Sequence, residues 1–247
     1  MFVDIHSHIL PKLDDGAANM ETSLSMLEIA SLSNIQNIIA TPHFIVDSLE
    51  TSIETIDRKC SELNENAKLN GINIKTLPGC EVFISPEIVK LIENGTIATL
   101  NNSKYVLIEF PLISIPPYSG ELLYSLQIKG FKPIIAHPER NKEIIKNPGI
   151  LYEFVQRGIY AQMNANSLTG VFGNEIAKIS LKLLEHKLIH FISSDAHTLK
   201  TRSPNLTDAA NIVRKKFGNN MVDLLFSING MNVINDMPID MDVPKQF

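Results

Sequence analysis

The stretch FVDIHSH, residues Phe2–His8, joins a short apolar run to two histidines that are separated by one residue. An apolar, β-branched run of this length is typical of a buried strand. Side chains two positions apart on a strand point to the same face, so His6 and His8 can reach one common point. Histidine often only caps a strand, and an H-x-H pair alone is weak evidence for a metal. The stretch predicts a strand whose C-terminal end is suited to an ion.

Similar apolar runs continue along the chain and alternate with longer amphipathic stretches. The runs predict strands at Phe2–Ile5, Asn37–Thr41, Ile72–Cys80, Tyr105–Phe110, Lys132–Ala136, Ile159–Met163 and His190–Ser193. The amphipathic stretches predict helices near Glu21–Ser33, Leu49–Asn70, Glu87–Glu93, Gly120–Ile128, Pro148–Arg157, Glu175–His186, Asn205–Phe217 and Asn220–Ile228. Strands that are each followed by a helix predict an α/β fold of parallel units, here a TIM-like (β/α)7 barrel. No linker-like stretch interrupts the series, so we expect one domain over residues 1–247.

Imidazole and carboxylate side chains recur where the predicted strands end. The candidate metal ligands are His6, His8, Asp15, His43, Glu81, Glu109, His137, Asp195 and His197. All but Asp15 lie at or just past the C-terminal end of a strand, which is the end of a β/α barrel that carries the active site. We therefore expect these residues to converge on one pocket, and we favour a metal site over structural histidines. The set contains no thiolate, so it admits manganese, iron or zinc.

Several classes of enzyme and location are excluded or disfavoured. A cysteine-dependent tyrosine phosphatase needs C-x5-R, but Asn66 stands six positions after Cys60 and Pro86 six positions after Cys80. The chain lacks a G-x-x-x-x-G-K-[ST] nucleotide loop and a G-x-S-x-G serine elbow. Its N-terminus does not resemble a secretion signal, and no apolar run approaches the roughly 20 residues that span a bilayer. These features predict a cytoplasmic protein with no membrane insertion.

Longer motifs around the candidate ligands resemble a known family. The motifs are DIHSHILPKLDDG, TPHF, GCEVFI, LIEF, AHPER and SSDAHTLKTR, and they cover nearly the whole chain. Together they resemble the PHP (polymerase and histidinol phosphatase) superfamily and, within it, the bacterial manganese-dependent protein-tyrosine phosphatases of capsule and exopolysaccharide loci. The resemblance implies a distorted TIM-like (β/α)7 barrel with a multinuclear metal site at the C-terminal ends of the strands. It also favours manganese over iron or zinc.

The resemblance further implies three ions and their ligands. One ion would be held by His6, His8, Glu81 and Asp195; a second by Glu81, Glu109 and His137; and a third by Asp15, His43 and His197. Glu81 would then bridge two ions. Of the pair Asp14–Asp15, the resemblance favours the residue directly before glycine as the ligand.

The charge of such a loaded site would suit a phosphate group. Four carboxylates contribute about −4 and three divalent ions about +6, which leaves the pocket positive. Arg140 and Arg202 follow ligand motifs and match the family's arginines, so we expect them to bind phosphoryl oxygens. The whole chain has a formal charge of −5 and gives no general reason to bind nucleic acid. The resemblance implies a phosphotyrosine protein as the substrate, the autophosphorylated tail of a bacterial tyrosine kinase, and makes a homo-oligomer plausible.

Two other functions stay open on the sequence. The same barrel could hydrolyse a small phosphomonoester such as histidinol phosphate, whereas a nucleic-acid diester is disfavoured by the absence of a basic, aromatic surface. Alternatively, the chain could be a non-catalytic PHP-like module that binds a partner. Two roles stay open for Glu139, which could either support the metal ligands or be an ordinary surface acid. The C-terminal stretch departs from the family at Asn229–Gly230, where Asn-Pro is expected, so its packing is not predicted.

Overall fold

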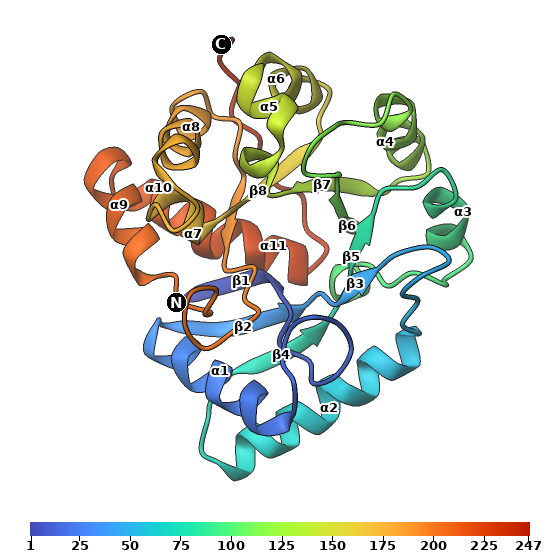
Figure 1. Cartoon of the computed structure of the whole chain (residues 1–247), viewed down its shortest axis with the longest axis vertical. Coiled ribbons are helices and arrows are strands. Elements are labelled where there is room, and N and C mark those ends of the chain that lie inside the picture. The colour runs from blue at the N-terminus through green and yellow to red at the C-terminus, as the bar shows by residue number, and fades with distance from the viewer.

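Two sheets of parallel strands form the framework of the protein, as the computed structural model of residues 1–247 shows (Figure 1). The first sheet contains β1 (Phe2–Ser7), β2 (Ile35–Ala40) and β4 (Lys75–Pro78), paired in that order. The second contains β3 (His43–Phe44), β5 (Glu81–Phe83), β6 (Tyr105–Glu109), β7 (Lys132–Ala136), β8 (Tyr160–Asn164) and β9 (Phe191–Ser193), also paired in that order. Every strand pair is parallel, so all the strands of a sheet end at the same edge.

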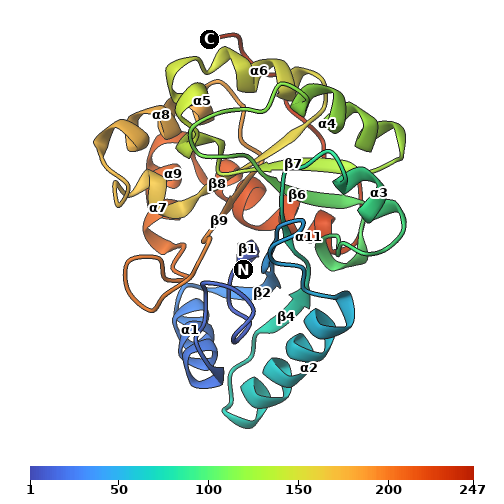
Figure 2. The same cartoon turned by 45° about the vertical axis from the view of Figure 1, so that its right-hand side comes forward.

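Helices connect the strands, and the last three of them follow the final strand. They are α1 (Met20–Leu32), α2 (Ile53–Leu69), α3 (Ile88–Glu93), α4 (Ser119–Ile128), α5 (Lys142–Lys146), α6 (Gly149–Gln156), α7 (Ala165–Leu168), α8 (Asn174–Glu185), α9 (Thr207–Phe217), α10 (Asn219–Asp223) and α11 (Asn229–Ile234). Short 3-10 turns stand at Leu100–Asn102 and Pro138–Arg140, and a π turn at Leu224–Ile228 joins α10 to α11. Figure 2 shows α1 and α2 packed against the smaller sheet, away from the remaining helices. No helix is long and apolar enough to cross a membrane.

The α/β class and the parallel strands are confirmed, but the expected closed barrel is not observed. The strand predicted at Ile72–Cys80 is shorter and ends at Pro78, and β5 starts separately at Glu81. The strand predicted at Asn37–Thr41 likewise ends at Ala40, and the short β3 that follows was not predicted. Pro42 lies in that second gap and has no N–H for a strand ladder, which is a physical reason for the break.

The remaining edges of the two sheets meet without forming a continuous ladder. No ladder pairs β1 with β9; instead, an isolated parallel bridge joins Ser7 to Ala196, which follows β9. Two backbone hydrogen bonds support this seam, from His8 N to Ala196 O at 2.9 Å and from Asp195 N to His6 O at 2.9 Å. The seam therefore fixes the end of β1 against the segment after β9, although the sheet is not closed.

The alternation of side chains along the strands produces two hydrophobic cores. Val106 and Ile108 of β6 point toward the helices and belong to the larger core of 51 buried residues. Their neighbours Tyr105 and Leu107 point the other way and belong to a core of 13 buried residues, together with Ile134 of β7. Both faces of the strands are thus buried, which is typical of parallel sheets and explains their nearly continuous apolar sequences.

The helices begin and pack as their sequences suggest. Ser52 caps α2 by accepting a hydrogen bond from Thr55 N. The helix then buries one face, through Ile56, Cys60, Leu63 and Ala67, at the spacing expected of an amphipathic helix. Cys60 is thereby a core residue, and both cysteines of the chain are buried free thiols.

The C-terminal segment packs across the starts of the strands. Tyr105, the first residue of β6, donates a hydrogen bond to Met237 O at 2.7 Å, and Tyr160, the first residue of β8, donates to Ile239 O at 3.3 Å. The departure from the family at Gly230 has a local explanation, because this residue lies in α11 directly against Val3 of β1. A side chain in its place would meet the Val3 side chain at 2.7 Å.

We expect the substitution Gly230→Ala to destabilise the protein by about 1–3 kcal/mol, because the added methyl group would overpack the contact between α11 and β1. The matched control is Gly120→Ala in α4, where an added Cβ has no neighbour within 4 Å. The control should be neutral or stabilising by up to about 1 kcal/mol, because alanine favours a helix over glycine. Urea unfolding of the two variants measures the difference, and equal stabilities would contradict the packing described.

Candidate metal centre

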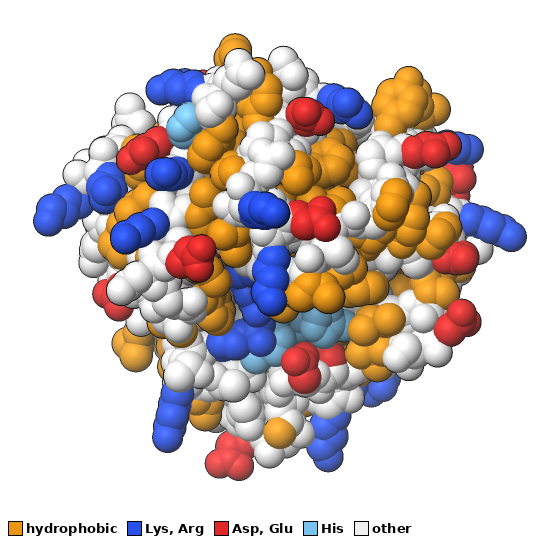
Figure 3. All heavy atoms as spheres, turned by 45° about the horizontal axis from the view of Figure 1, so that its top comes forward, with side chains coloured by type: hydrophobic (Ala, Val, Ile, Leu, Met, Phe, Trp, Pro, Cys, Tyr) orange, Lys and Arg blue, Asp and Glu red, His pale blue; other side chains and the backbone are white.

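The predicted ligand side chains gather at the edge where the strands end. His6 lies near the end of β1 and His8 directly follows it, Glu109 ends β6, His137 follows β7, and Asp195 follows β9. His43 and Glu81 open β3 and β5 and are paired with each other in the strand register. In the space-filling view, histidine side chains reach the surface beside acidic and basic side chains, with hydrophobic side chains adjoining them (Figure 3). Every residue that the sequence put forward as a ligand lies in this one cluster.

Four of these side chains form a compact group of ligand atoms. His6 Nε2 lies 3.3 Å from His8 Nε2, 3.2 Å from Glu81 Oε2 and 3.5 Å from Asp195 Oδ1. His8 Nε2 lies 3.3 Å from the same Glu81 oxygen and 3.5 Å from the same Asp195 oxygen. All four side chains are almost completely buried. The two histidine nitrogens therefore approach an oxygen of Glu81 and an oxygen of Asp195 in a place that water hardly reaches.

These separations fit a divalent cation. Ligand atoms about 2.0–2.2 Å from a tetrahedral ion are about 3.3–3.6 Å from one another, which matches the spacing of this group. In addition, Glu81 Oε2 is buried and has no hydrogen-bond partner, although it lies near several ring nitrogens. A buried carboxylate oxygen without a partner is costly unless a charge compensates it. The residues present thus fit a metal ion.

A second group gathers around the carboxylates of Glu81 and Glu109. His137 Nε2 lies 3.0 Å from Glu81 Oε1 and 3.6 Å from Glu109 Oε1. His43 Nδ1 lies 3.1 Å from Glu81 Oε2 and 3.7 Å from Glu109 Oε2, and it also has no hydrogen-bond partner. The geometry therefore brings His43 as well as His137 to the two glutamates. Glu81 contacts both groups, as a bridging ligand must.

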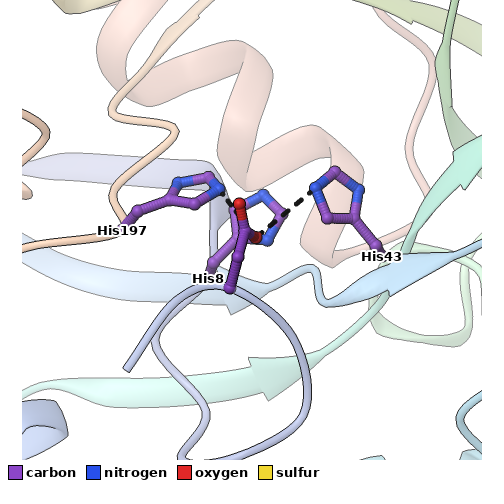
Figure 4. Close-up of side chains that lie close together, drawn as sticks. His8, His43 and His197 are labelled. Carbon is purple, nitrogen blue, oxygen red and sulfur yellow. Dashed lines mark ion pairs between the residues drawn. The ribbon is translucent and has the colours of Figure 1, made fainter. Parts of the chain in front are cut away.

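A third group is more exposed. The rings of His8, His43 and His197 point toward one another, as Figure 4 shows. Asp15 Oδ1 lies 3.3 Å from His197 Nε2 and 3.7 Å from His43 Nε2. The Asp15 side chain is 65% exposed, whereas the acidic side chains of the first group are 1–2% exposed. An ion in the third group would thus have the most contact with solvent.

Asp14 has a different role from its neighbour Asp15. Its carboxylate lies 2.7 Å from His8 Nδ1 and accepts backbone hydrogen bonds from Gly16 N at 2.9 Å and His43 N at 3.1 Å. It can therefore orient the His8 ring so that Nε2 faces the first group. Gly16 allows the close turn, because a Cβ there would lie 2.0 Å from the backbone oxygen of His8.

The two predicted phosphate-binding arginines meet on one ligand. Arg140 donates to Asp195 Oδ2 at 3.1 Å, and Arg202 donates to the same oxygen at 2.8 Å. Both side chains are partly exposed, with 19% and 26% of their surface accessible. The guanidinium of Arg140 also stacks over Phe172, 4.7 Å from the ring centre. Both arginines are thus held at the rim of the cluster with donors left for another anion.

Glu139 is a buried residue rather than a surface acid. Its Oε1 accepts hydrogen bonds from Ser167 Oγ at 2.6 Å and Asn164 N at 3.0 Å, so it ties the 3-10 turn Pro138–Arg140 to the end of β8. Burial raises the pKa of this carboxyl group, against the effect of the Ser167 hydrogen bond. The backbone at this turn is unusual, because His137 has φ +30°. A tightly bonded Glu139 helps to hold that conformation.

Three polar residues that contact ligands were missed by the sequence analysis. They are Asp4, Gln162 and Asn164, all with no exposed surface. Asp4 accepts hydrogen bonds from Ser194 N and Ser194 Oγ and thereby joins β1 to the segment after β9. For the two amides the only available signal was their spacing, with Gln162 in the strand predicted at Ile159–Met163 and Asn164 just past its end. Alternating amides are not specific enough to predict a site.

The charges of the cluster depend strongly on one another. Burial alone would raise the pKa of Glu81, but the nearby histidines, His6 first, hold it well below its ordinary value. Burial and then the charge of Glu81 raise the pKa of Glu109 to about 7. Burial lowers the pKa of His6, but Glu81 and Asp195 outweigh this effect and raise it to about 8. Burial lowers the pKa of His197 to about 4. Without an ion, protonated histidines thus balance the acidic side chains.

Comparison with known proteins places the chain in a family. The fold and the site define an α/β protein with several buried groups suited to divalent cations. The family model for capsular polysaccharide synthesis, CpsB/CapC, matches residues 2–235. The chain belongs to the CpsB/CapC family.

Relatives with this fold include named enzymes. Tyrosine-protein phosphatase YwqE of Bacillus subtilis is 40% identical over 223 residues, covering 90% of this chain and 88% of YwqE. Tyrosine-protein phosphatase CpsB of Streptococcus pneumoniae is 30% identical over 242 residues, covering 96% and 100%. A solved structure from the pair YwqE of B. subtilis and CpsB of S. pneumoniae, unique metal-dependent tyrosine phosphatases, has a TM-score of 0.96 at 38% identity and covers 99% of both chains.

We expect metal binding to weaken as the pH falls. In the metal-free protein the pKa of His6 is about 8 and that of Glu109 about 7, so both groups hold protons below those values that an ion must displace. The apparent affinity for Mn²⁺ should fall below pH 8, by roughly tenfold per pH unit for each displaced proton. Calorimetric titration at pH 6.5 and 8.5, in buffers of different ionisation enthalpy, measures both the affinity and the protons released. Equal affinities with no proton release would contradict the described charge state.

We expect the variant Asp15→Asn to lose at most one ion per chain, because this exposed carboxylate approaches only the third group. The control Asp57→Asn changes an exposed acid on α2 and should leave the metal content unchanged. Metal analysis by mass spectrometry after desalting measures the number of ions. Loss of all metal from the Asp15→Asn protein, with the fold intact, would contradict the separation of the three groups.

Proposed function

We propose that this protein is a metal-dependent protein-tyrosine phosphatase that hydrolyses phosphotyrosine by direct attack of water on phosphorus. The observation that carries the proposal is the convergence of buried histidine nitrogens on the two oxygens of Glu81, with two arginines on the adjacent Asp195. Membership of the CpsB/CapC family and likeness to enzymes named tyrosine-protein phosphatases support the choice of substrate.

The ligands proposed for each ion are those that the family resemblance implies, and they lie within the three groups described above. His6, His8, Glu81 and Asp195 would hold one ion; Glu81, Glu109 and His137 a second; and Asp15, His43 and His197 a third. Divalent ions at these positions would lower the pKa of a bound water and neutralise charge on the phosphoryl group. The oxygen and nitrogen donors suit Mn²⁺, Fe or Zn²⁺, and we propose Mn²⁺. We further propose that the strands around the metal centre form a distorted TIM-like arrangement, although the sheet is not closed.

The protein's own cations complete the recognition of phosphate. Arg140 and Arg202 already neutralise Asp195 Oδ2, and their remaining N–H groups can donate to phosphoryl oxygens. Phe172 under Arg140 limits the positions that this guanidinium can take. The two arginines would thus stabilise negative charge as the bond to the leaving group breaks. A phenolate leaving group needs little help from a general acid, because the pKa of tyrosine is about 10.

The apolar surface near the site is compatible with an aromatic substrate. Leu112 and Ile113 are exposed on the loop that follows Glu109 and β6. Asn141 anchors this loop next to Arg140 by donating hydrogen bonds to Pro111 O at 2.7 Å and Ser114 O at 3.1 Å. An apolar loop held beside a phosphate-binding arginine suits the ring of a phosphotyrosine.

The partners and location of the protein complete the proposal. The substrate would be the autophosphorylated tail of a bacterial tyrosine kinase that controls capsule or exopolysaccharide synthesis, which agrees with the family description. Such a tail would meet the enzyme in the cytoplasm. A homo-oligomer, and one domain over residues 1–247, remain predictions.

The substrate class can be tested by comparing three phosphate esters with the Mn²⁺-loaded protein: a phosphotyrosyl peptide, histidinol phosphate and a DNA oligonucleotide. We expect the highest kcat/KM for the peptide, because its leaving group departs most readily and its ring can contact the apolar loop. If histidinol phosphate is the best substrate, the protein is a small-molecule phosphatase. If the loaded and folded protein hydrolyses none of them, a binding module replaces the proposed enzyme.

We expect Glu81→Ala to reduce activity more than Arg140→Ala, because Glu81 approaches two ligand groups, whereas Arg140 contacts only one oxygen of one proposed ligand. Arg140→Ala should lower kcat/KM by roughly 10²-fold and keep the metal content of the parent protein. Arg214→Ala, on the exposed face of α9, is the control and should behave as the parent. Steady-state kinetics and metal analysis of the same samples measure kcat/KM and metal content for each variant. Full metal content in the Glu81→Ala protein would count against a bridging role.

A further inference from the structure

Strand β8 contributes no proposed metal ligand, yet two amide side chains on it contact the cluster. Gln162 and Asn164 are separated by one residue, so both point to the same face of the strand. Neither has any exposed surface. Buried amides of this kind must satisfy several hydrogen bonds at once, which restricts how they and their partners are oriented.

The two amides connect one proposed ligand to another. Gln162 Oε1 lies 2.9 Å from His6 Nδ1, and Gln162 Nε2 donates to Asn164 Oδ1 at 3.0 Å. Asn164 Nδ2 then donates to Asp195 Oδ2 at 2.6 Å. A continuous chain of hydrogen bonds thus runs from His6 through β8 to Asp195.

The direction of this chain is fixed from both ends. An ionised carboxylate only accepts hydrogen bonds, so Asn164 must turn its NH₂ group to Asp195 and its oxygen to Gln162. Gln162 must then donate to Asn164 and present its own oxygen to His6. The backbone N–H of His137, 3.4 Å from Gln162 Oε1, independently requires an acceptor at that position. His6 therefore faces an acceptor at Nδ1 and must donate there.

We propose that Gln162 and Asn164 act as a pair of positioning residues that holds His6 in the Nδ1–H tautomer and turns Asp195 Oδ1 toward the metal. In this tautomer the lone pair of His6 is on Nε2, the atom that lies within 3.2–3.5 Å of His8, Glu81 and Asp195. Asp195 Oδ2 is at the same time occupied by Asn164, which leaves Oδ1 for the ion. The inference rests on the proposed function, because it assumes that this group binds a cation.

The pair differs from the partner of the second histidine in the same group. His8 Nδ1 lies 2.7 Å from Asp14, a carboxylate, so His8 is oriented by a charged acceptor. Gln162 gives His6 the same orientation without adding another negative charge to a site that already contains several carboxylates. Neutral and charged partners on neighbouring ligands let the site fix both rings while limiting its total charge.

The tautomer of His6 in the metal-free protein is the direct test. Long-range ¹H–¹⁵N correlation spectra at pH 9, where neutral imidazole predominates, distinguish Nδ1–H from Nε2–H rings, and loss of a signal in His6→Asn assigns it. We expect Nδ1–H for His6 in the parent protein. An Nε2–H ring in the parent would overturn the proposal without need of any variant on β8.

Variants of Gln162 separate positioning from simple packing. Gln162→Leu keeps the volume of the side chain but removes the hydrogen-bond acceptor for His6 Nδ1. We expect His6 to lose its preference for the Nδ1–H tautomer and Mn²⁺ binding to weaken by roughly 10–100-fold. Gln162→Glu restores an acceptor and should restore the Nδ1–H tautomer. Met163→Leu, on the opposite face of β8, is the control and should change neither property. Retention of the parent tautomer and Mn²⁺ affinity in Gln162→Leu would overturn the proposal.

The outcomes distinguish this inference from the proposed function. If the parent binds Mn²⁺ but does not hydrolyse phosphotyrosine, the proposed function fails while the tautomer and affinity results still stand. If the parent shows the Nδ1–H tautomer and binds no Mn²⁺, the hydrogen-bond chain is correct but its role toward a metal is overturned. If Gln162→Leu does not fold, the proposal is tested by the tautomer of His6 in the parent protein and by the Mn²⁺ affinity of Gln162→Glu.

Discussion

A buried carboxylate surrounded by imidazoles is the constraint on which the site depends. The oxygens of Glu81 lie 3.0–3.3 Å from ring nitrogens of His6, His8, His43 and His137, and the side chain is 1% exposed. Removing a carboxylate from water costs several kcal/mol unless positive charge compensates it. Protonated histidines can provide that charge in the metal-free protein, and cations can provide it in the loaded one. The same arrangement of side chains can therefore stabilise the metal-free protein and hold the ions proposed for the loaded one.

The fold delivers these side chains by the direction of its strands rather than by any one loop. Parallel pairing of β3 with β5 sets His43 opposite Glu81, and the seam between β1 and β9 brings His6 beside Asp195. Asp195 then joins the ligands to the rim, because its Oδ2 accepts from Asn164, Arg140 and Arg202. One oxygen therefore contacts both the amide of β8 and the two arginines that we propose bind phosphate.

The sequence predicted the class of fold and the cluster, but not the connections around them. Apolar periodicity did not locate two of the short strands that carry a ligand, β3 and β5, because two or three residues are too few to have a period. It also predicted closure of the sheet, which Pro42 and the breaks after β2 and β4 prevent. The ligands were predictable because histidines and acids at strand ends are distinctive. Asp14 was seen but not its contact with His8, and Gln162 was not predicted at all, because hydrogen bonds between distant segments leave no local pattern.

The segment after α11 closes the opposite end of the strands from the metal cluster. Its contacts with Tyr105 and Tyr160 lie at the first residues of β6 and β8, about 15 Å along the strands from the ligands. The contacts of this segment thus contribute to stability at one end of the strands, whereas the proposed catalysis takes place at the other end. Alterations in this segment would change how long the protein survives heat or proteolysis, while each surviving molecule would work at its former rate.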